Sequence, residues 1–347
     1  MKRSNLRLCN LFYYLNLIQF NSTLFALSWC IEDWSFPLGF KFGAATSAYQ
    51  VEGACNVSGK GESIWDRFTH ATPDAISDRS NGDVAANSYH LWGRDIEMME
   101  ELGLHFYRFS ISWTRILPTG FANNVSSAGV KHYSDLIDGL LEKGIEPVVT
   151  LYHWDLPQTL QNLGGWTNPL VATWFRDYAR VVFTLFGDRV KLWITINEAL
   201  IACDYTYNTG TMAPGFTDPE ISSYLCNKHI LMAHAHAWRL YDEEFRWMYH
   251  VSLSNHLIWF DPLTEEDEEL AELARENCAG RYSHPIYSKE GGWPPAIEKI
   301  MAENSLKKGY PASTFPSFTQ EEKEFVRGRF QGLIKTFSYL PIALRVT

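Results

Sequence analysis

The sequence has little positive charge for its length and lacks the glycine-rich motifs that hold nucleotide phosphates. Its 347 residues carry 30 Lys and Arg against 40 Asp and Glu, which gives a formal net charge of −10. That balance offers no basic face to nucleic acid or to an anionic membrane surface. Gly39, Gly43 and Gly53 form neither a GxGxxG fingerprint nor a P-loop. We therefore expect no nucleic-acid partner and no nucleotide cofactor.

Cysteine is scarce as well, and its spacing matches no zinc site. Of the six cysteines, four lie beyond the amino-terminal region, and their spacings are not those of zinc-binding motifs. These four are Cys55, Cys203, Cys226 and Cys278. Cys203 and Cys226 either form a disulfide that closes a loop or remain two free buried thiols. The sequence predicts no metal site.

Beyond the amino terminus, the sequence has no apolar run long enough to span a membrane. Residues 1–28 have a basic start, an apolar stretch and a small-residue ending at Ala26 and Ser28. This pattern predicts a secretory signal peptide; the alternative is an amphipathic amino-terminal helix. Asn56-Val57-Ser58 and Asn124-Val125-Ser126 are glycosylation sequons. We expect a secreted, extracellular glycoprotein.

Apolar residues, in contrast, are plentiful. Hydrophobic residues make up 46% of the chain, enough for one large domain or two ordinary ones. Aromatic residues make up 15%, including 13 Trp, and such side chains fill cores or stack on flat apolar faces such as those of sugar rings. For any single Trp, core packing is the better default.

The order of apolar runs predicts a parallel sheet. Five β-type runs are expected at 41–49, 107–112, 146–154, 191–197 and 249–255. Amphipathic helical segments are expected between them, around 93–103, 129–143, 170–186 and 224–245. The strand runs are nearly continuous in apolar residues, so both faces of the sheet should be covered, as in parallel α/β folds. Further acidic helical runs and a loop-like stretch at 284–295 follow.

Polar residues mark the carboxyl ends of these strands. The clearest case is KLWITINEALIAC (191–203), where an apolar strand ends on Asn197 and Glu198 before the chain turns apolar again. Burying a carboxylate there is unfavourable unless its charge or proton is used. Polar groups also end the earlier runs. Polar groups gathered at strand carboxyl ends are typical of the active site of a (β/α)8 barrel.

Several motifs in order resemble glycoside hydrolase family 1, the group of β-glucosidases and insect myrosinases. They run from about residue 34 to about 328 and comprise FGAATSAYQVEG (42–53), SIWDRF (63–68), YRFSISWTRILP (107–118), TLYHWDLPQ (150–158), GGW (164–166) and TINEA (195–199). HPIYSKEGGWP (284–294), GYP (309–311) and FTQEEKEFVRG (318–328) resemble the insect and animal branch. The resemblance implies an α/β fold, a (β/α)8 TIM barrel, of which about the first five to six β/α units are present.

The resemblance assigns the catalytic acid/base to Glu198. A strand-end carboxyl that is partly desolvated can donate a proton to a leaving oxygen. Read without the family, Glu198 has the alternative role of capping the helix that follows it. By the same resemblance, Asn197 holds the sugar 2-hydroxyl, a contact that strengthens in an oxocarbenium-like transition state.

The remaining predicted site residues surround this pair. Gln50 and His153 resemble the family's glycone-binding residues, and each offers uncharged donors and acceptors to hydroxyl groups. Trp154 is expected in the wall of the sugar pocket, with core packing as the alternative. Arg108 corresponds to the arginine beside the nucleophile carboxylate, and without that carboxylate we expect an unpaired buried guanidinium.

The sequence departs from the family pattern in several places. The nucleophile of this family is the Glu of a downstream [IV]-T-E-N-G strand, and the chain holds no such motif. Glu276 and Glu303 are each followed by Asn, but neither follows a β-branched strand, so neither is accepted as the nucleophile. Residues 329–347 have no family counterpart, 246–251 suggest a small deletion, and Ala199 replaces the usual Pro.

We therefore predict a signal peptide at 1–28, a partial barrel domain at 29–328 and an unrelated tail at 329–347. The expected family function is hydrolysis of O-glycosyl bonds in β-glucosides or related small β-glycosides and oligosaccharides by a retaining mechanism, without metal or organic cofactor. For this chain, lack of the nucleophile predicts little or no activity, and open sheet edges predict poor folding alone. The alternatives are a glycoside-binding pseudo-enzyme and a mispredicted or spliced fragment.

Overall fold

The computed structural model describes residues 36–245 and 250–328. The chain divides into a unit that ends at Phe42 and a second unit that begins at Gly43. In the described part of the first unit, the rings of Phe36, Phe40 and Phe42 contact one another. The predicted signal peptide and the predicted tail lie outside the described residues.

Five parallel strands form one sheet in the order in which they occur along the chain. They are β1 (Gly43–Ala45), β2 (Phe106–Ser110), β3 (Glu146–Tyr152), β4 (Leu192–Asn197) and β5 (His250–Ser254). The last four agree with the predicted strands. The first prediction, 41–49, was too long, because the chain leaves the sheet at Ser47, the N-cap of the short helix α2 (Ala48–Val51).

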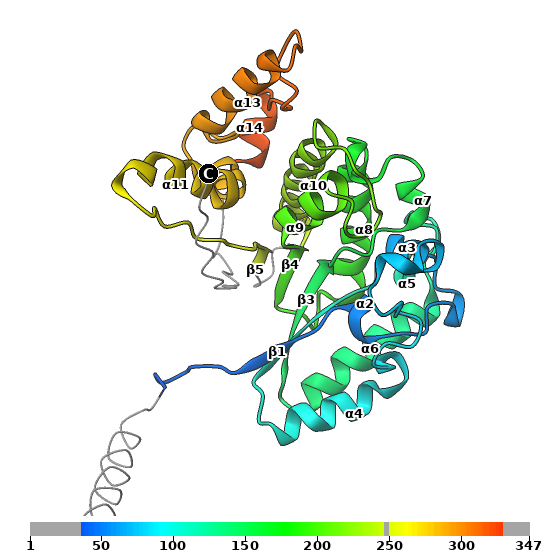
Figure 1. Ribbon diagram of the computed structural model, residues 1–347. Helices are drawn as coiled ribbons and strands as arrows, with labels where there is room; N and C mark the ends of the chain where they lie inside the picture. The colour runs from blue at the N-terminus through cyan, green and yellow to red at the C-terminus, as the bar shows by residue number, and fades with distance from the viewer. Residues whose placement is uncertain (1–35, 246–249, 329–347) are drawn as a thin grey trace, which may run out of the picture. The chain divides into compact units, whose positions relative to one another are not determined.

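A long helix follows each of the first four strands, which gives the alternating β/α order seen in Figure 1. These helices are α4 (Ser88–Glu101), α6 (Ser127–Glu142), α8 (Val171–Phe186) and α10 (Ser222–Glu244). Gly103 and Gly144 come just after α4 and α6 and have φ of +66° and +72°. Glycine is the residue that adopts this left-handed conformation without strain, so both predicted helix ends are confirmed.

Shorter helices complete the described chain. They are α3 (Ile64–Ala71), α5 (Trp113–Ile116), α7 (Gln158–Gln161), α9 (Ala199–Cys203), α11 (Glu268–Arg275), α12 (Arg281–Tyr287), α13 (Pro295–Lys307) and α14 (Gln320–Val326). One-turn segments lie at Val57–Gly59, Pro73–Ala75, Gly165–Thr167 and Glu265–Asp267, and π-helical turns at Asp204–Asn208 and Glu276–Gly280. The acidic runs form α11 and α14, as predicted. The prediction of loop from 284 was wrong for its first residues, which belong to α12 despite Pro285.

Aromatic residues fill the space between the sheet and its helices. Trp193 of β4 packs edge-on against Phe183 of α8, with ring centroids 5.0 Å apart. Trp113 stacks on Tyr178 of the same helix at 4.5 Å. All four side chains are buried, and burial of rings this large contributes strongly to core stability. Core packing is therefore the role of these tryptophans.

Within the described residues no helix has the length and hydropathy needed to cross a bilayer.

Candidate active site

The carboxyl ends of β2, β3 and β4 bring the predicted polar residues together, and Asn197 is their common partner. Arg108 of β2 donates a hydrogen bond from Nη2 to the Asn197 side-chain oxygen. The Asn197 amide nitrogen lies 3.1 Å from Nε2 of His153, which follows β3. The Trp154 indole donates to the backbone carbonyl of Asn197 at 2.8 Å. Because parallel strands end at one edge of the sheet, residues far apart in sequence meet there.

Glu198 follows Asn197 directly and has a backbone conformation that is rare for a side chain of its kind. Its φ is +45°, in the left-handed region that disfavours residues with a Cβ. Its N–H donates to the carbonyl of Ser254 at the end of β5, at 2.7 Å, and this bond holds the turn. Strained backbone of this type gathers at functional sites.

The Glu198 side chain does not cap the helix that it precedes. Glu198 occupies the N-cap position of α9, yet its carboxyl group makes no capping hydrogen bond. Its oxygens lie 3.3 Å from the Asn197 amide nitrogen and 3.6 Å from Nδ1 of His256. The side chain keeps 20% of its surface exposed. The capping interpretation is therefore wrong, and the carboxyl group is accessible to a ligand.

Arg108 is partly buried, and the acceptors of its hydrogen bonds are neutral. Nε donates to the Thr150 hydroxyl at 3.0 Å, and Nη2 donates to Asn197. Burial lowers the pKa of the guanidinium, an effect that the charge of Glu198 opposes. Arg108 forms no ion pair with a described residue, as expected without the nucleophile carboxylate, but its guanidinium is not without partners, because it donates to two neutral acceptors on β3 and β4.

His153 is held in its neutral form. Because the Asn197 amide nitrogen donates to Nε2, the ring proton is assigned to Nδ1. Nδ1 is buried and has no hydrogen-bond partner among the described residues. Burial, followed by the charge of Arg108, lowers the pKa of His153 to about 3. A neutral imidazole with a free N–H suits a ligand hydroxyl oxygen.

A cleft of about 390 Å³ lies beside this network, and Gln50, His153 and Trp154 are among its lining residues. Gln50 lies on α2, and its side-chain oxygen accepts a hydrogen bond from Ser47 at 2.7 Å. That bond fixes the amide and leaves its NH₂ group available to a ligand. Trp154 is partly buried and lines the cleft, so it is part of the wall. A cleft of this size, lined by rings and a few polar groups, fits a small ligand.

His256 belongs to the same site and was not predicted. It follows β5 and lies beside Glu198. The rule that selected the other residues, a polar side chain just after a buried strand, also applies to it. Among the described residues, no group of three or more His, Cys, Asp or Glu is placed to hold a metal ion.

The arrangement combines one accessible carboxyl group with a set of neutral donors and acceptors. Gln50, His153 and Asn197 carry amide and imidazole groups of the kind that bind hydroxyl groups, and Trp154 supplies a ring face. Glu198 is the group in this set that can transfer a proton. This chemistry suits a ligand that is rich in hydroxyl groups and has one oxygen to be protonated.

Comparison with known proteins agrees with this chemistry. The model of "Glycosyl hydrolase family 1" matches residues 32–340. Myrosinase 1 of Brevicoryne brassicae is 43% identical over 301 residues, which cover 85% of this chain and 64% of that protein. The human cytosolic beta-glucosidase is 42% identical over 299 residues, with the same coverage.

Solved structures show the same likeness. The structure of an aphid myrosinase superposes with a TM-score of 0.82 at 43% identity and covers 85% of this chain and 64% of its own. A beta-glucosidase from Thermotoga maritima, solved with castanospermine, gives a TM-score of 0.77 at 36% identity, with 86% of this chain and 64% of that chain covered. The chain thus spans about 64% of the length of these relatives.

Proposed function

The chain belongs to glycosyl hydrolase family 1, and we propose that its strand-end site binds β-glucosides or related β-glycosides, with Glu198 as the proton donor to the glycosidic oxygen. The observation that carries this proposal is the network on Asn197, which places a neutral His153, a partly buried Arg108 and the accessible Glu198 carboxyl group around one amide. The names of the relatives, myrosinase and beta-glucosidase, support the choice of ligand.

The glycone would bind in the cleft lined by Gln50, His153 and Trp154. The free amide of Gln50 and the Nδ1–H of His153 are donors for sugar hydroxyl groups, and the indole of Trp154 covers an apolar sugar face. The Asn197 amide, which already contacts both His153 and Glu198, is placed to meet the 2-hydroxyl next to the scissile bond.

The chemical step in this proposal requires a second carboxylate. A retaining glycosidase uses two carboxyl groups about 5–5.5 Å apart, one as acid/base and one as nucleophile. Among the described residues, the recorded polar partners of the Glu198 carboxyl group are Asn197 and His256, and neither is an acid. We therefore propose that the 347-residue chain on its own binds glycosides with little or no turnover. The same observation favours a second function, that of a glycoside-binding protein.

The test measures turnover and binding separately on the 347-residue chain. Release of nitrophenol from nitrophenyl β-glucoside should not exceed that of Glu198→Gln, whereas titration with gluconolactone should give saturable binding. Gln50→Ala should weaken that binding by up to about tenfold, the effect of losing one hydrogen bond. The matched change Gln320→Ala, at an exposed site on α14, should leave it unaltered. Robust turnover that Glu198→Gln abolishes would refute the proposed inactivity; no binding and no turnover would refute the glycoside site itself.

We also propose that the protein enters the secretory pathway. A disulfide joins Cys203 to Cys226, and structural disulfides are typical of oxidising compartments. Both sequon asparagines, Asn56 and Asn124, are exposed. Expression in secreting eukaryotic cells should yield a glycosylated product whose mass falls on treatment with a glycosidase specific for N-linked glycans. Retention in the cytosol, without glycan, would contradict the proposal.

A further inference from the structure

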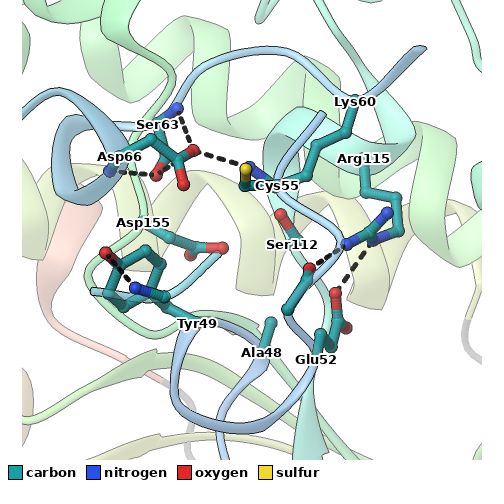
Figure 2. Close-up of a pocket in the computed structure, with 12 residues that line it drawn as sticks. Ala48, Tyr49, Glu52, Cys55, Lys60, Ser63, Asp66, Ser112, Arg115 and Asp155 are labelled. Carbon is teal, nitrogen blue, oxygen red and sulfur yellow. Dashed lines mark hydrogen bonds and ion pairs between the residues drawn. The ribbon is translucent and has the colours of Figure 1, made fainter. Parts of the chain in front are cut away.

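A small cavity adjoins the cleft and is lined by charged side chains. Tyr49 and Gly82 line both spaces. The cavity has a volume of about 10 Å³, and its lining includes Glu52, Arg115 and Asp155 (Figure 2). A space of about 10–15 Å³ on this measure admits one water molecule, provided that polar groups surround it. The family resemblance assigns no role to these residues, and the proposed function does not use them.

Asp155 is the unusual member of this group. It is 2% exposed, and both of its carboxyl oxygens lack a hydrogen-bond partner among the described residues. The charge of Lys60, the backbone amide of Asp155 and the Ser112 hydroxyl favour the ionised form, but none of the three forms a hydrogen bond to the carboxyl oxygens. An ionised carboxylate in such a place would be strongly unfavourable, because a buried charge without partners loses its hydration.

The other two acids in the lining are satisfied. Glu52 accepts hydrogen bonds from Arg115 Nε at 2.8 Å and from the Tyr133 hydroxyl at 2.5 Å. Asp66 accepts from Lys60 at 2.6 Å and from the backbone and hydroxyl of Ser63 at 2.8 Å.

The two cations are thus engaged with two other carboxylates, and an ionised Asp155 would give this group a net charge of −1. Arg115 Nη1 and the remaining proton of Lys60 are the cationic donors left for a bound molecule; Nη1 has no partner among the described residues.

The other titratable groups around Asp155 bring no positive charge. Burial raises the pKa of each of them, so all stay neutral near pH 7. They are Tyr49 on α2, Cys55 in the loop before Lys60, Tyr133 on α6, Tyr152 on β3 and Tyr178 on α8. Burial, followed by the charge of Glu52, also raises the pKa of Asp155, to about 7.

We propose that Asp155 keeps its proton in the folded protein and that the cavity holds one water molecule between its neutral carboxyl group and the free donors of Arg115 and Lys60. The carboxyl O–H of Asp155 donates to this water, and the water accepts a second hydrogen bond from an N–H of Arg115 or Lys60. The carboxyl group thereby gains a partner, and the cavity gains no negative charge. Above the titration of Asp155, the proton leaves to solvent, and the cavity gains an uncompensated negative charge.

The segment that carries Asp155 is tied to the opposite wall of the cavity. Ile64 N–H donates to Leu156 O, and Gln158 N–H donates to Glu62 O, both at 2.9 Å. Repulsion between an ionised Asp155 and the carboxylates of Glu52 and Asp66 would therefore strain the same segment that holds His153 two residues earlier. The pH dependence of stability should report this strain.

The number of protons bound in each state sets the direction in which stability changes with pH. The pKa of Asp155 is about 7 in the folded chain, whereas an unfolded aspartate titrates at about 3.9. Between these values the folded state binds more protons than the unfolded state. The unfolding equilibrium constant therefore rises by about tenfold per pH unit from about pH 4 to about pH 7, and this contribution is constant above pH 7.

The experiment compares urea unfolding of the dilute wild-type chain, Asp155→Asn and Asp74→Asn from about pH 4.5 to pH 8.5. Asp155→Asn cannot titrate, so the ratio of the wild-type to the variant unfolding constant should rise about tenfold per pH unit up to about pH 7. Asp74 has an exposed side chain (79%), and its variant should follow the wild-type slope. Equal slopes for the wild type and Asp155→Asn would overturn the proposal.

A second measurement needs the wild type alone and remains available if Asp155→Asn does not fold. The infrared spectrum of the chain near pH 6 should contain the C=O stretching band of a neutral carboxylic acid, and the band should disappear by about pH 9 as the group ionises. A spectrum without this band near pH 6 would show that Asp155 is ionised, which overturns the proposal.

Discussion

At the residue scale, Asn197 is the common hydrogen-bonding partner of several other site residues. Its side chain contacts Arg108, His153 and Glu198, and its carbonyl accepts from Trp154. The sequence pattern predicts that these residues lie near one another, since each is in or just after one of the parallel strands. It does not predict that the arginine would be satisfied by neutral acceptors, because that depends on the register that sets Arg108 of β2 beside Val148 of β3, two residues from Thr150.

His153 and Asp155, two residues apart, should have opposite effects on stability as the pH changes. The pKa of His153 is lowered to about 3, below the value of about 6.5 for an unfolded histidine. The unfolded chain therefore takes up a proton that the folded chain does not, and the stability due to neutral His153 is complete above pH 6.5 and lost as pH falls towards 3. Asp155 acts in the reverse sense, so between about pH 4 and pH 6.5 the two contributions offset each other.

The low pKa of His153 predicts how the stability of His153→Gln should change with pH relative to the wild type. Glutamine keeps hydrogen-bonding capacity but cannot take up a proton, so the variant should gain stability relative to the wild type as pH falls from about 6.5 to about 4.5, by about tenfold per pH unit in the unfolding constant. Asp155→Asn should shift in the opposite direction over the same range. Urea unfolding at three or four pH values measures both, and a constant ratio of wild type to His153→Gln would show that folding does not lower the pKa of His153.

At the element scale, the regular parts of the fold were predictable and the transitions between them were not. The strands β2 to β5 and the helices α4, α6, α8 and α10 follow from apolar runs and helical periodicity. The early end of β1 depends on Ser110, whose hydroxyl accepts from the N–H of Ala48 and helps turn the chain into α2. Such a contact over 62 residues cannot be read from local pattern. Likewise, the stretch 284–295 was predicted as loop-like, yet its first residues belong to α12, which contains Pro285.

The cysteine pair was left open by the sequence, and the structure resolves it as a disulfide between Cys203 at the end of α9 and Cys226 on α10. The bond closes a separation of 23 residues, so its loss should reduce the free energy of unfolding by about 3 kcal/mol, chiefly through the unfolded chain. Cys203→Ala with Cys226→Ala, measured by urea unfolding, tests this. Alanine at Cys55 and Cys278, the free thiols of the described residues, is the control that separates loss of the disulfide from other effects of removing a cysteine. An unchanged stability after reduction of the wild type would contradict the expectation.

At the scale of the whole molecule, the sheet has two strands with a single neighbour each among the described residues. β1 pairs with β2, and β5 pairs with β4. All three residues of β1 are exposed, although the first strand of a closed barrel would be covered on both sides. Unpaired strand edges present N–H and C=O groups that attract the edge of another chain. The 64% span relative to the family's relatives accords with a sheet of five strands rather than eight.

The β1 edge predicts that the purified 347-residue chain self-associates as its concentration rises. The weight-average mass from sedimentation or light scattering should increase with concentration, because β1 has one neighbouring strand among the described residues and its other edge can pair with a second chain. Ala44→Lys places a charge on β1 and should lower the mass at a given concentration, since a lysine on an edge strand opposes pairing. Leu163→Lys adds the same charge at an exposed site (51%) away from the sheet edges and should have no such effect. A chain that stays monomeric at all concentrations, or an equal response to both lysines, would contradict association through the β1 edge.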